Sequence, residues 1–186
     1  YNNRAAFAEF VTERNISRDD LAMLGVLLPP DEGWALNDVL GNGYMRFRDR
    51  LMFPVVDFRG DVRGFSARIL DPNKKTAKYI NSPETPIFVK GEQLYGAFTA
   101  RSEARKAGRA IICEGNVDVI ALWEFGFPGT VAAMGTALTM SQARLVKRLD
   151  EHVVCVMDGD AAGAKAAFAS LSVFLELGLQ PRAVML

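Results

Sequence analysis

Apolar runs and helical repeats alternate along the second half of the chain. The runs predict strands and the spacing of three and four residues predicts helices, in the order strand 109–113, helix 117–125, strand 130–134, helix 141–149, strand 153–157, helix 161–177 and strand 182–186. Ser141 is expected to cap its helix, and Gly178 to end the helix before it. Repeated strand–helix units with short loops predict a parallel sheet with right-handed crossovers.

The first half of the chain has a mixed pattern. Residues 5–13 have helical spacing, and Ser17 followed by two acids two and three positions later predicts the start of a second helix. Alternating residues at 51–58 and 62–70 predict a β-hairpin that turns at 59–61. A polar loop at 71–78 and a helix at about 98–106 follow. The fold class is therefore α/β, with a mixed α+β subdomain at 1–105 and a parallel-sheet subdomain at 106–186.

Composition narrows the class of protein. The chain has 186 residues, of which 49% are hydrophobic, so it can bury a real core. No apolar run approaches the roughly 20 residues that span a bilayer, and a cytoplasmic protein without membrane contact is expected. Cys113 and Cys155 lie inside predicted strands and are interpreted as core side chains, not as a disulfide or zinc ligands. His152, the lone histidine, is expected at the surface and is assigned no role.

The charges are unevenly distributed although they balance overall. Residues 1–45 carry 3 basic and 7 acidic side chains, whereas residues 46–90 carry 10 basic and 5 acidic ones. A basic stretch beside an acidic site suits a polyanion whose phosphates are held by Lys and Arg. The alternative is a solvated surface of mixed charge.

Two acidic motifs follow two of the predicted strands. Glu114 and Asp118 come after the strand at 109–113, and Asp158 and Asp160 after the strand at 153–157. Carboxyl ends of parallel strands are where open α/β sheets bind ligands, and four carboxylates there repel one another unless cations neutralise them. Oxygen donors alone favour Mg²⁺ or Mn²⁺ over zinc. The alternative is that these acids lie at helix N-termini and interact with the helix dipole.

The same motifs resemble those of a known fold. Glu114-Gly115 and Asp158-Gly159-Asp160 are similar to the two acidic motifs of the Toprim fold, which primases, topoisomerases, some nucleases and recombination mediators share. Four stretches of the first half, at 46–54, 64–68, 78–85 and 90–96, resemble the RNA polymerase domain of the bacterial DnaG-type primase. The resemblance implies a Toprim-type parallel sheet flanked by helices and preceded by a basic subdomain.

Residue by residue, the resemblance implies three groups of site residues. It assigns divalent metal to Glu114, Asp118, Asp158 and Asp160, with Glu114, Asp158 and Asp160 as the catalytic acids. It assigns the incoming nucleotide to Arg46, Lys78, Tyr79 and Asn81, and the single-stranded template to Arg68 and Lys90. Gly135 matches a glycine loop that would keep the site open. Arg and Lys suit phosphate, and single strands are held by charge and stacking.

The resemblance therefore predicts the catalytic-core fragment of a DNA primase, which makes short RNA primers on single-stranded DNA from nucleoside triphosphates. The family carries a further acidic motif beyond Leu186, so the metal-binding subdomain is expected to be truncated. The replicative helicase would bind through a module that follows the polymerase domain. Two alternatives stay open, namely a Toprim nuclease or topoisomerase, and a module that binds nucleotide or single-stranded DNA without turnover.

Overall fold

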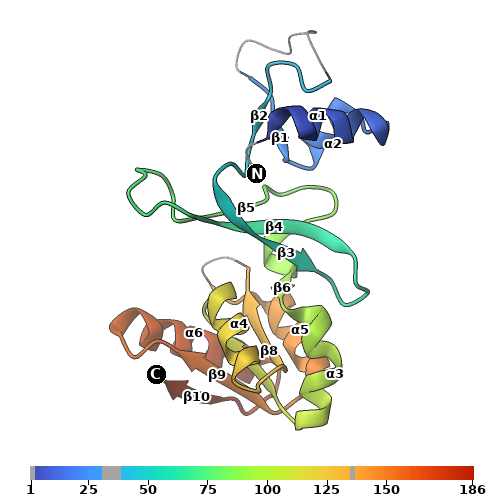
Figure 1. Ribbon diagram of the computed structural model, residues 1–186. Helices are drawn as coiled ribbons and strands as arrows, with labels where there is room; N and C mark the ends of the chain where they lie inside the picture. The colour runs from blue at the N-terminus through green and yellow to red at the C-terminus, as the bar shows by residue number, and fades with distance from the viewer. Residues whose placement is uncertain (1–2, 31–38, 135–136) are drawn as a thin grey trace. The chain divides into compact units, whose positions relative to one another are not determined.

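The chain divides into two compact units. A computed structural model describes residues 3–30, 39–134 and 137–186 (Figure 1). One unit comprises the residues up to Pro54 together with Gly64–Phe88, and the other comprises Val55–Arg63 with Val89–Leu186. The boundary between residues 105 and 106 that the sequence suggested stays a prediction.

The first unit combines two helices with two small sheets. Its elements are α1 (Arg4–Glu13), α2 (Arg18–Met23), β1 (Leu27–Leu28), β2 (Tyr44–Met45), β3 (Arg50–Val56), β4 (Val62–Ile69) and β5 (Tyr79–Asn81). The tip of the β3–β4 hairpin, Val55–Arg63, belongs to the second unit. Ser17 caps α2 as predicted, because its hydroxyl accepts a hydrogen bond from the Asp20 N–H at 3.0 Å. The predicted hairpin is confirmed, and β5 joins it in the strand order β3-β4-β5. Strands β1, β2 and β5 escaped prediction because two or three residues are too few to show alternation.

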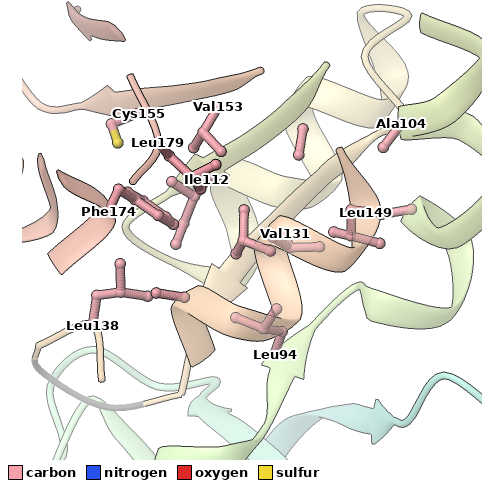
Figure 2. Packing of buried hydrophobic residues seen from close by; sticks show 14 of the residues in the cluster. Leu94, Ala104, Ile112, Val131, Leu138, Leu149, Val153, Cys155, Phe174 and Leu179 are labelled. Carbon is pink, nitrogen blue, oxygen red and sulfur yellow. The ribbon is translucent and has the colours of Figure 1, made fainter. Parts of the chain in front are cut away.

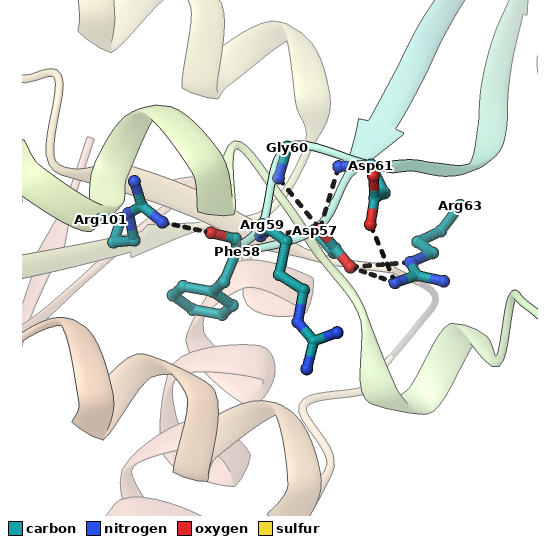
Figure 3. Close-up of polar contacts among 7 residues, drawn as sticks. All are labelled: Asp57, Phe58, Arg59, Gly60, Asp61, Arg63 and Arg101. Atoms are coloured by element: carbon teal, nitrogen blue, oxygen red, sulfur yellow. Dashed lines mark hydrogen bonds and ion pairs between the residues drawn. The ribbon is translucent and has the colours of Figure 1, made fainter.

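Asp57 organises the turn of the β3–β4 hairpin. One carboxylate oxygen accepts hydrogen bonds from the N–H groups of Arg59, Gly60 and Asp61, at 2.8, 3.1 and 3.1 Å (Figure 3). The other oxygen lies 2.6 Å from the Arg63 guanidinium. Burial alone would raise the pKa of Asp57, but the hydrogen bonds from Arg63 and the backbone outweigh it and hold the pKa below its usual value.

The second unit is a five-stranded sheet with helices packed on it. Its elements are the 3₁₀ helix η1 (Lys90–Glu92), β6 (Leu94–Tyr95), α3 (Ala97–Ala107), β7 (Ala110–Cys113), α4 (Asn116–Glu124), β8 (Thr130–Ala133), α5 (Met140–Leu149), β9 (Val153–Met157), α6 (Ala161–Glu176) and β10 (Arg182–Met185). The strand order is β10-β9-β7-β8-β6, in which only β6 runs antiparallel to its neighbour. The predicted parallel sheet and its four helices are confirmed. No helix in the described ranges is long and apolar enough to cross a membrane.

The crossovers place the helices on the two faces of this sheet. Helix α3 packs on α5, and α5 packs on α6, so these three helices share one face. The β7–β8 and β8–β9 connections run in opposite directions along the sheet. Right-handed crossovers therefore place α4 on the other face.

The N-cap of helix α5 lies two residues before the predicted one. Thr139, and not Ser141, is the N-cap: its hydroxyl accepts from the Gln142 N–H at 3.0 Å, and Gln142 Oε1 accepts from the Thr139 N–H at 3.0 Å. This reciprocal capping box explains the correction, because Ser141 lacks an acid or amide three residues later. Gln142 is fully buried and also donates to the carbonyl oxygens of Lys90 and Gln93, each at 2.9 Å.

The main core lies between the sheet and helices α3, α5 and α6. Ile112, Val131 and Val153 from the strands meet Leu149 and Phe174 from the helices (Figure 2). Cys155 belongs to this core, and burial raises the pKa of its thiol to about 12. Both cysteines are buried and free, which confirms their interpretation as core side chains.

We expect Asp57→Asn to destabilise the hairpin in a pH-dependent way. Because the folded pKa of Asp57 lies below the unfolded value of about 3.9, its ionised form stabilises the fold above that value and loses this effect as pH falls through the folded pKa. Urea unfolding should therefore show wild type more stable than the variant at pH 7, with the difference shrinking below about pH 4. Asp61→Asn, at a side chain that is 65% exposed, is the matched control. A difference that is constant with pH would contradict the assignment.

Candidate functional site

The two acidic motifs meet at the carboxyl ends of neighbouring strands. Strands β7 and β9 are parallel neighbours in which Ile112 pairs with Cys155. Glu114 follows β7 and Asp158 follows β9, and Glu114 Oε1 accepts a hydrogen bond from the Asp158 N–H at 3.0 Å. The structure thus brings together two of the predicted catalytic acids, as expected for this edge of a parallel sheet.

Gly163 lets helix α6 approach this pair closely. A β-carbon at Gly163 would collide with the carbonyl oxygen of Asp158 and lie 2.8 Å from Glu114 Oε1. Sequence reasoning missed this residue. The available signal was a glycine in the first turn of an alanine-rich helix, where it costs about 1 kcal/mol relative to alanine and therefore needs a packing or functional reason.

The other two acids cap helices. Asp118 Oδ2 accepts from the Gly115 N–H at 2.9 Å at the start of α4, and Asp160 Oδ1 accepts from the Gly163 N–H at 2.7 Å at the start of α6. Both acids therefore lie at helix N-termini, where they interact with the backbone N–H groups and the helix dipole. This was the alternative to metal binding that the sequence left open. Each carboxylate retains a second oxygen for another partner.

The four carboxylates are ligands that suit a hard cation, but the described residues do not place three such ligands together. Residues 3–30, 39–134 and 137–186 contain no group of three or more His, Cys, Asp and Glu side chains placed to hold a metal ion. Burial, followed by the negative charge of Asp118 and then Glu114, raises the pKa of the Cys113 thiol to about 12. The thiol therefore stays protonated, and the carboxylate oxygens remain as the available ligands.

A basic pocket of about 400 Å³ lies in the first unit and contains Arg46. The Arg46 guanidinium donates through Nε and Nη2 to the carbonyl oxygen of Asn81, at 3.2 and 3.0 Å. Burial lowers the pKa of Arg46 from its usual value. Two of the four residues predicted to bind nucleotide are thus in direct contact.

Two further arginines of this pocket were not predicted. Arg50 is only 8% exposed and donates to the carbonyl oxygen of Ala77 at 2.9 Å and to Thr76 Oγ1 at 3.0 Å, so it holds the loop that closes the pocket. The Arg48 guanidinium lies 3.8 Å from the centre of the Tyr44 ring. Their sequence signal was the alternation of arginines from 46 to 50, which places several positive charges along one short segment.

Tyr79 lies at the surface between two predicted cationic residues. Its side chain is 39% exposed, with the Arg68 guanidinium 5.9 Å and Lys78 Nζ 6.0 Å from the ring centre. Arg68 and Lys78 also line a pocket of about 440 Å³. Tyr79 is therefore not a core residue, although its stacking role stays a prediction.

The remaining predicted residues are dispersed. Lys90 begins η1 in the second unit, where its carbonyl oxygen accepts from Gln142, and its contact with template stays a prediction. Gly135 lies outside the described residues. His152 has a side chain that is 86% exposed, as expected, and its ring lies 3.1 Å from Asp150.

Two family models together match most of the chain. The model of the DNA primase catalytic core, N-terminal domain, matches residues 1–101, and the model of the Toprim domain matches residues 108–184. The DNA primase of Halalkalibacterium halodurans is 44% identical over 146 residues, which are 78% of this chain and 24% of that protein. The chain therefore spans about a quarter of the length of this relative.

Solved structures agree with the family models. The Aquifex aeolicus primase, with zinc-binding and RNA polymerase domains, is 33% identical with a TM-score of 0.89 over 99% of this chain and 43% of that one. A DnaG primase catalytic domain bound to single-stranded DNA is 37% identical with a TM-score of 0.79 over 95% of this chain and 54% of that one. These matches confirm the resemblance and give no support to the nuclease or topoisomerase alternative.

We expect Gly163→Ala to disturb the acidic pair. The added methyl group has to displace the start of α6 or the Glu114 carboxylate, because its nearest neighbours are the Asp158 backbone and that carboxylate. The free energy of unfolding should fall by about 1–3 kcal/mol in urea titrations. Ala162→Ser, which adds one atom at an exposed position of the same turn, should have little effect. Equal stability of Gly163→Ala and wild type would show that the approach is not constrained.

Proposed function

We propose that this chain forms the catalytic core of an enzyme that makes short RNA primers on single-stranded DNA from nucleoside triphosphates. The chain belongs to the DNA primase catalytic core family, which supports this proposal. The observation that carries the proposal is the hydrogen bond from the Asp158 N–H to Glu114, which joins the two acidic motifs at one sheet edge. Nucleotidyl transfer needs a negatively charged triphosphate and a primer 3′-hydroxyl held in line, so charge neutralisation and positioning supply the catalysis.

Glu114, Asp118, Asp158 and Asp160 would hold the divalent cation, Mg²⁺ or Mn²⁺. Such a cation lowers the cost of developing charge on the attacking and leaving oxygens. Glu114, Asp158 and Asp160 are the acids assigned to catalysis. Asp118 and Asp160 would share their oxygens between the helix N–H groups and the cation, since each uses one oxygen as a cap.

Arg46, Lys78, Tyr79 and Asn81 would bind the incoming nucleotide. The Arg46 guanidinium is fixed against Asn81 through Nε and Nη2, which leaves Nη1 for a phosphate oxygen. Lys78 supplies charge beside the exposed Tyr79 ring, on which a base or ribose can pack. Arg46 lines the pocket of about 400 Å³, whose volume suits a nucleotide, and Lys78 lines the pocket of about 440 Å³, which shares Ile69, Lys74 and Thr76 with it.

Template, partners and location complete the proposal. Arg68 and Lys90 would contact the single-stranded template, and the DnaG primase domain bound to single-stranded DNA supports this class of ligand. The basic subdomain at 1–105 and the metal-binding subdomain at 106–186 would act together in the cytoplasm. The replicative helicase would bind through a segment beyond residue 186.

A binding module without turnover is the second candidate. It is favoured by one observation, that the described residues hold no ready group of three metal ligands. A chain that binds nucleoside triphosphate and single-stranded DNA but incorporates no labelled ribonucleotide, even when extended past Leu186, would favour this candidate.

We expect Asp158→Asn to abolish primer synthesis while the fold persists. The fold should persist because Asp158 contacts Glu114 through its backbone N–H, which the substitution retains. Loss of a metal ligand should lower the rate by on the order of a hundredfold or more, in an assay of labelled ribonucleotide incorporation on single-stranded DNA with Mg²⁺ or Mn²⁺. The assay should use this chain and a version extended past Leu186. Glu176→Gln, at an exposed acid of α6, is the control. Undiminished synthesis by Asp158→Asn would overturn the metal assignment.

We expect Lys78→Gln to raise the KM for nucleoside triphosphate about tenfold with a smaller change in kcat, because a phosphate contact made equally in the ground and transition states affects binding alone. Initial rates of primer synthesis at varied nucleotide concentration measure both constants. Lys75→Gln is the matched control, because Lys75 is exposed and lines neither the pocket of about 400 Å³ nor the pocket of about 440 Å³. The same KM for both variants would remove Lys78 from the nucleotide site.

A further inference from the structure

Four arginines of the second unit surround a pocket that the proposed function does not use. The pocket has a volume of about 540 Å³ and is lined by Phe58, Arg59, Arg101, Ser102, Arg105 and Arg148. These residues come from the hairpin turn, from α3 and from α5, which are distant in the sequence. Four guanidinium groups at one pocket create a concentrated positive potential.

The neighbouring acids do not neutralise this charge. Asp57 forms an ion pair with Arg63 and Glu103 with Lys106, while Asp150 accepts a hydrogen bond from the backbone N–H of His152. Within residues 3–30, 39–134 and 137–186, none of the four arginines forms an ion pair. The pocket therefore presents positive charge that the described residues do not balance.

The pocket is held in shape by the hairpin turn and the two helices. Arg101 Nη1 donates to the carbonyl oxygen of Phe58 at 2.6 Å (Figure 3), and the Arg148 guanidinium lies 4.9 Å from the centre of the Phe58 ring. Gly60 brings the turn against α3, because a β-carbon there would lie 3.1 Å from the Phe98 ring. Arg101 and Arg148 are thus positioned by Phe58.

The other two arginines make no such contacts. Within the parts of the chain that the structure describes, Arg59 and Arg105 form no side-chain hydrogen bond, ion pair or ring contact. In Figure 3 the Arg59 side chain extends from the turn while Asp57 is directed to the backbone N–H groups and Arg63. Their donors are therefore available to an anion.

The geometry points to a second nucleic-acid contact, in which this pocket binds the backbone phosphates of a strand. Guanidinium groups bind phosphate oxygens through paired N–H donors, and they remain charged at any physiological pH. Phe98 is 45% exposed, and the Arg101 guanidinium lies 5.5 Å from the centre of its ring. An exposed aromatic ring beside a cluster of arginines is suited to a single strand, which is held by charge and stacking. This contact stands on the arginine pocket alone and does not depend on primer synthesis.

The double variant Arg59→Gln/Arg105→Gln tests the contact with least disturbance to the fold. Fluorescence anisotropy should follow binding of a labelled oligothymidylate to the 186-residue chain in EDTA without nucleotide, from about 50 to about 200 mM salt. We expect the affinity of the variant for the oligothymidylate to fall on the order of tenfold. The slope of log affinity against log salt concentration should fall in magnitude by roughly 0.7 for each phosphate contact that is lost. Arg109→Gln/Arg182→Gln removes the same charge from exposed arginines outside the pocket and should leave the slope nearly unchanged.

Two outcomes would overturn the proposal. The first is equal affinity and salt slope for the two double variants, with unfolding curves that match wild type, since general charge would then explain all binding. The second is a labelled oligoglutamate that binds wild type as tightly as the oligothymidylate and loses affinity only in the pocket variant, because the pocket would then serve an acidic peptide. Failure of primer synthesis affects neither readout, because the assay contains no metal or nucleotide.

Discussion

The close approach of helix α6 to the ends of β7 and β9 sets the geometry of the acidic site. Gly163 has no side chain, so the helix can begin against the Asp158 carbonyl and the Glu114 carboxylate. The same helix start supplies the Gly163 N–H that Asp160 caps at 2.7 Å. The absence of a β-carbon at Gly163 therefore permits the contacts that Glu114, Asp158 and Asp160 make at the start of α6.

The acids of this site carry two tasks that compete for the same oxygens. Without any cation, Asp160 contributes about 1 kcal/mol as the N-cap of α6, and Asp118 satisfies the N–H of Gly115, the N-cap of α4. As metal ligands, they would have to keep these N–H contacts with one oxygen and offer the other. The caps thus keep the acids close to the strand ends and limit the electrostatic repulsion among them, because each negative charge faces the positive end of a helix.

The sequence predicted the elements that repeat a pattern several times and missed those that depend on a single contact. Helices of nine residues or more and strands of four or more show their periodicity, which is why the sheet and its crossovers were predictable. The N-cap of α5 was misplaced because the reciprocal bonds of Thr139 and Gln142 outweigh the propensity of Ser141. The contact between Arg46 and the Asn81 carbonyl required the hairpin to pair with β5, a strand too short to predict.

The two basic pockets illustrate why residue type alone does not define a binding site. In the first unit, Arg46 donates to the carbonyl oxygen of Asn81 and Arg50 to that of Ala77, so part of their role is to hold the backbone in place. In the second unit, the side chains of Arg59 and Arg105 form no hydrogen bond with the described residues, while Arg101 donates to the Phe58 carbonyl oxygen and Arg148 lies against the Phe58 ring. A guanidinium whose N–H groups bond to backbone carbonyl oxygens holds a site in shape, whereas one whose N–H groups form no hydrogen bond gives the site its affinity for anions. The packing of α3, α5 and the hairpin turn brings residues 59, 101, 105 and 148 together. Because these residues are far apart in the chain, no local sequence pattern could have predicted the pocket that they form.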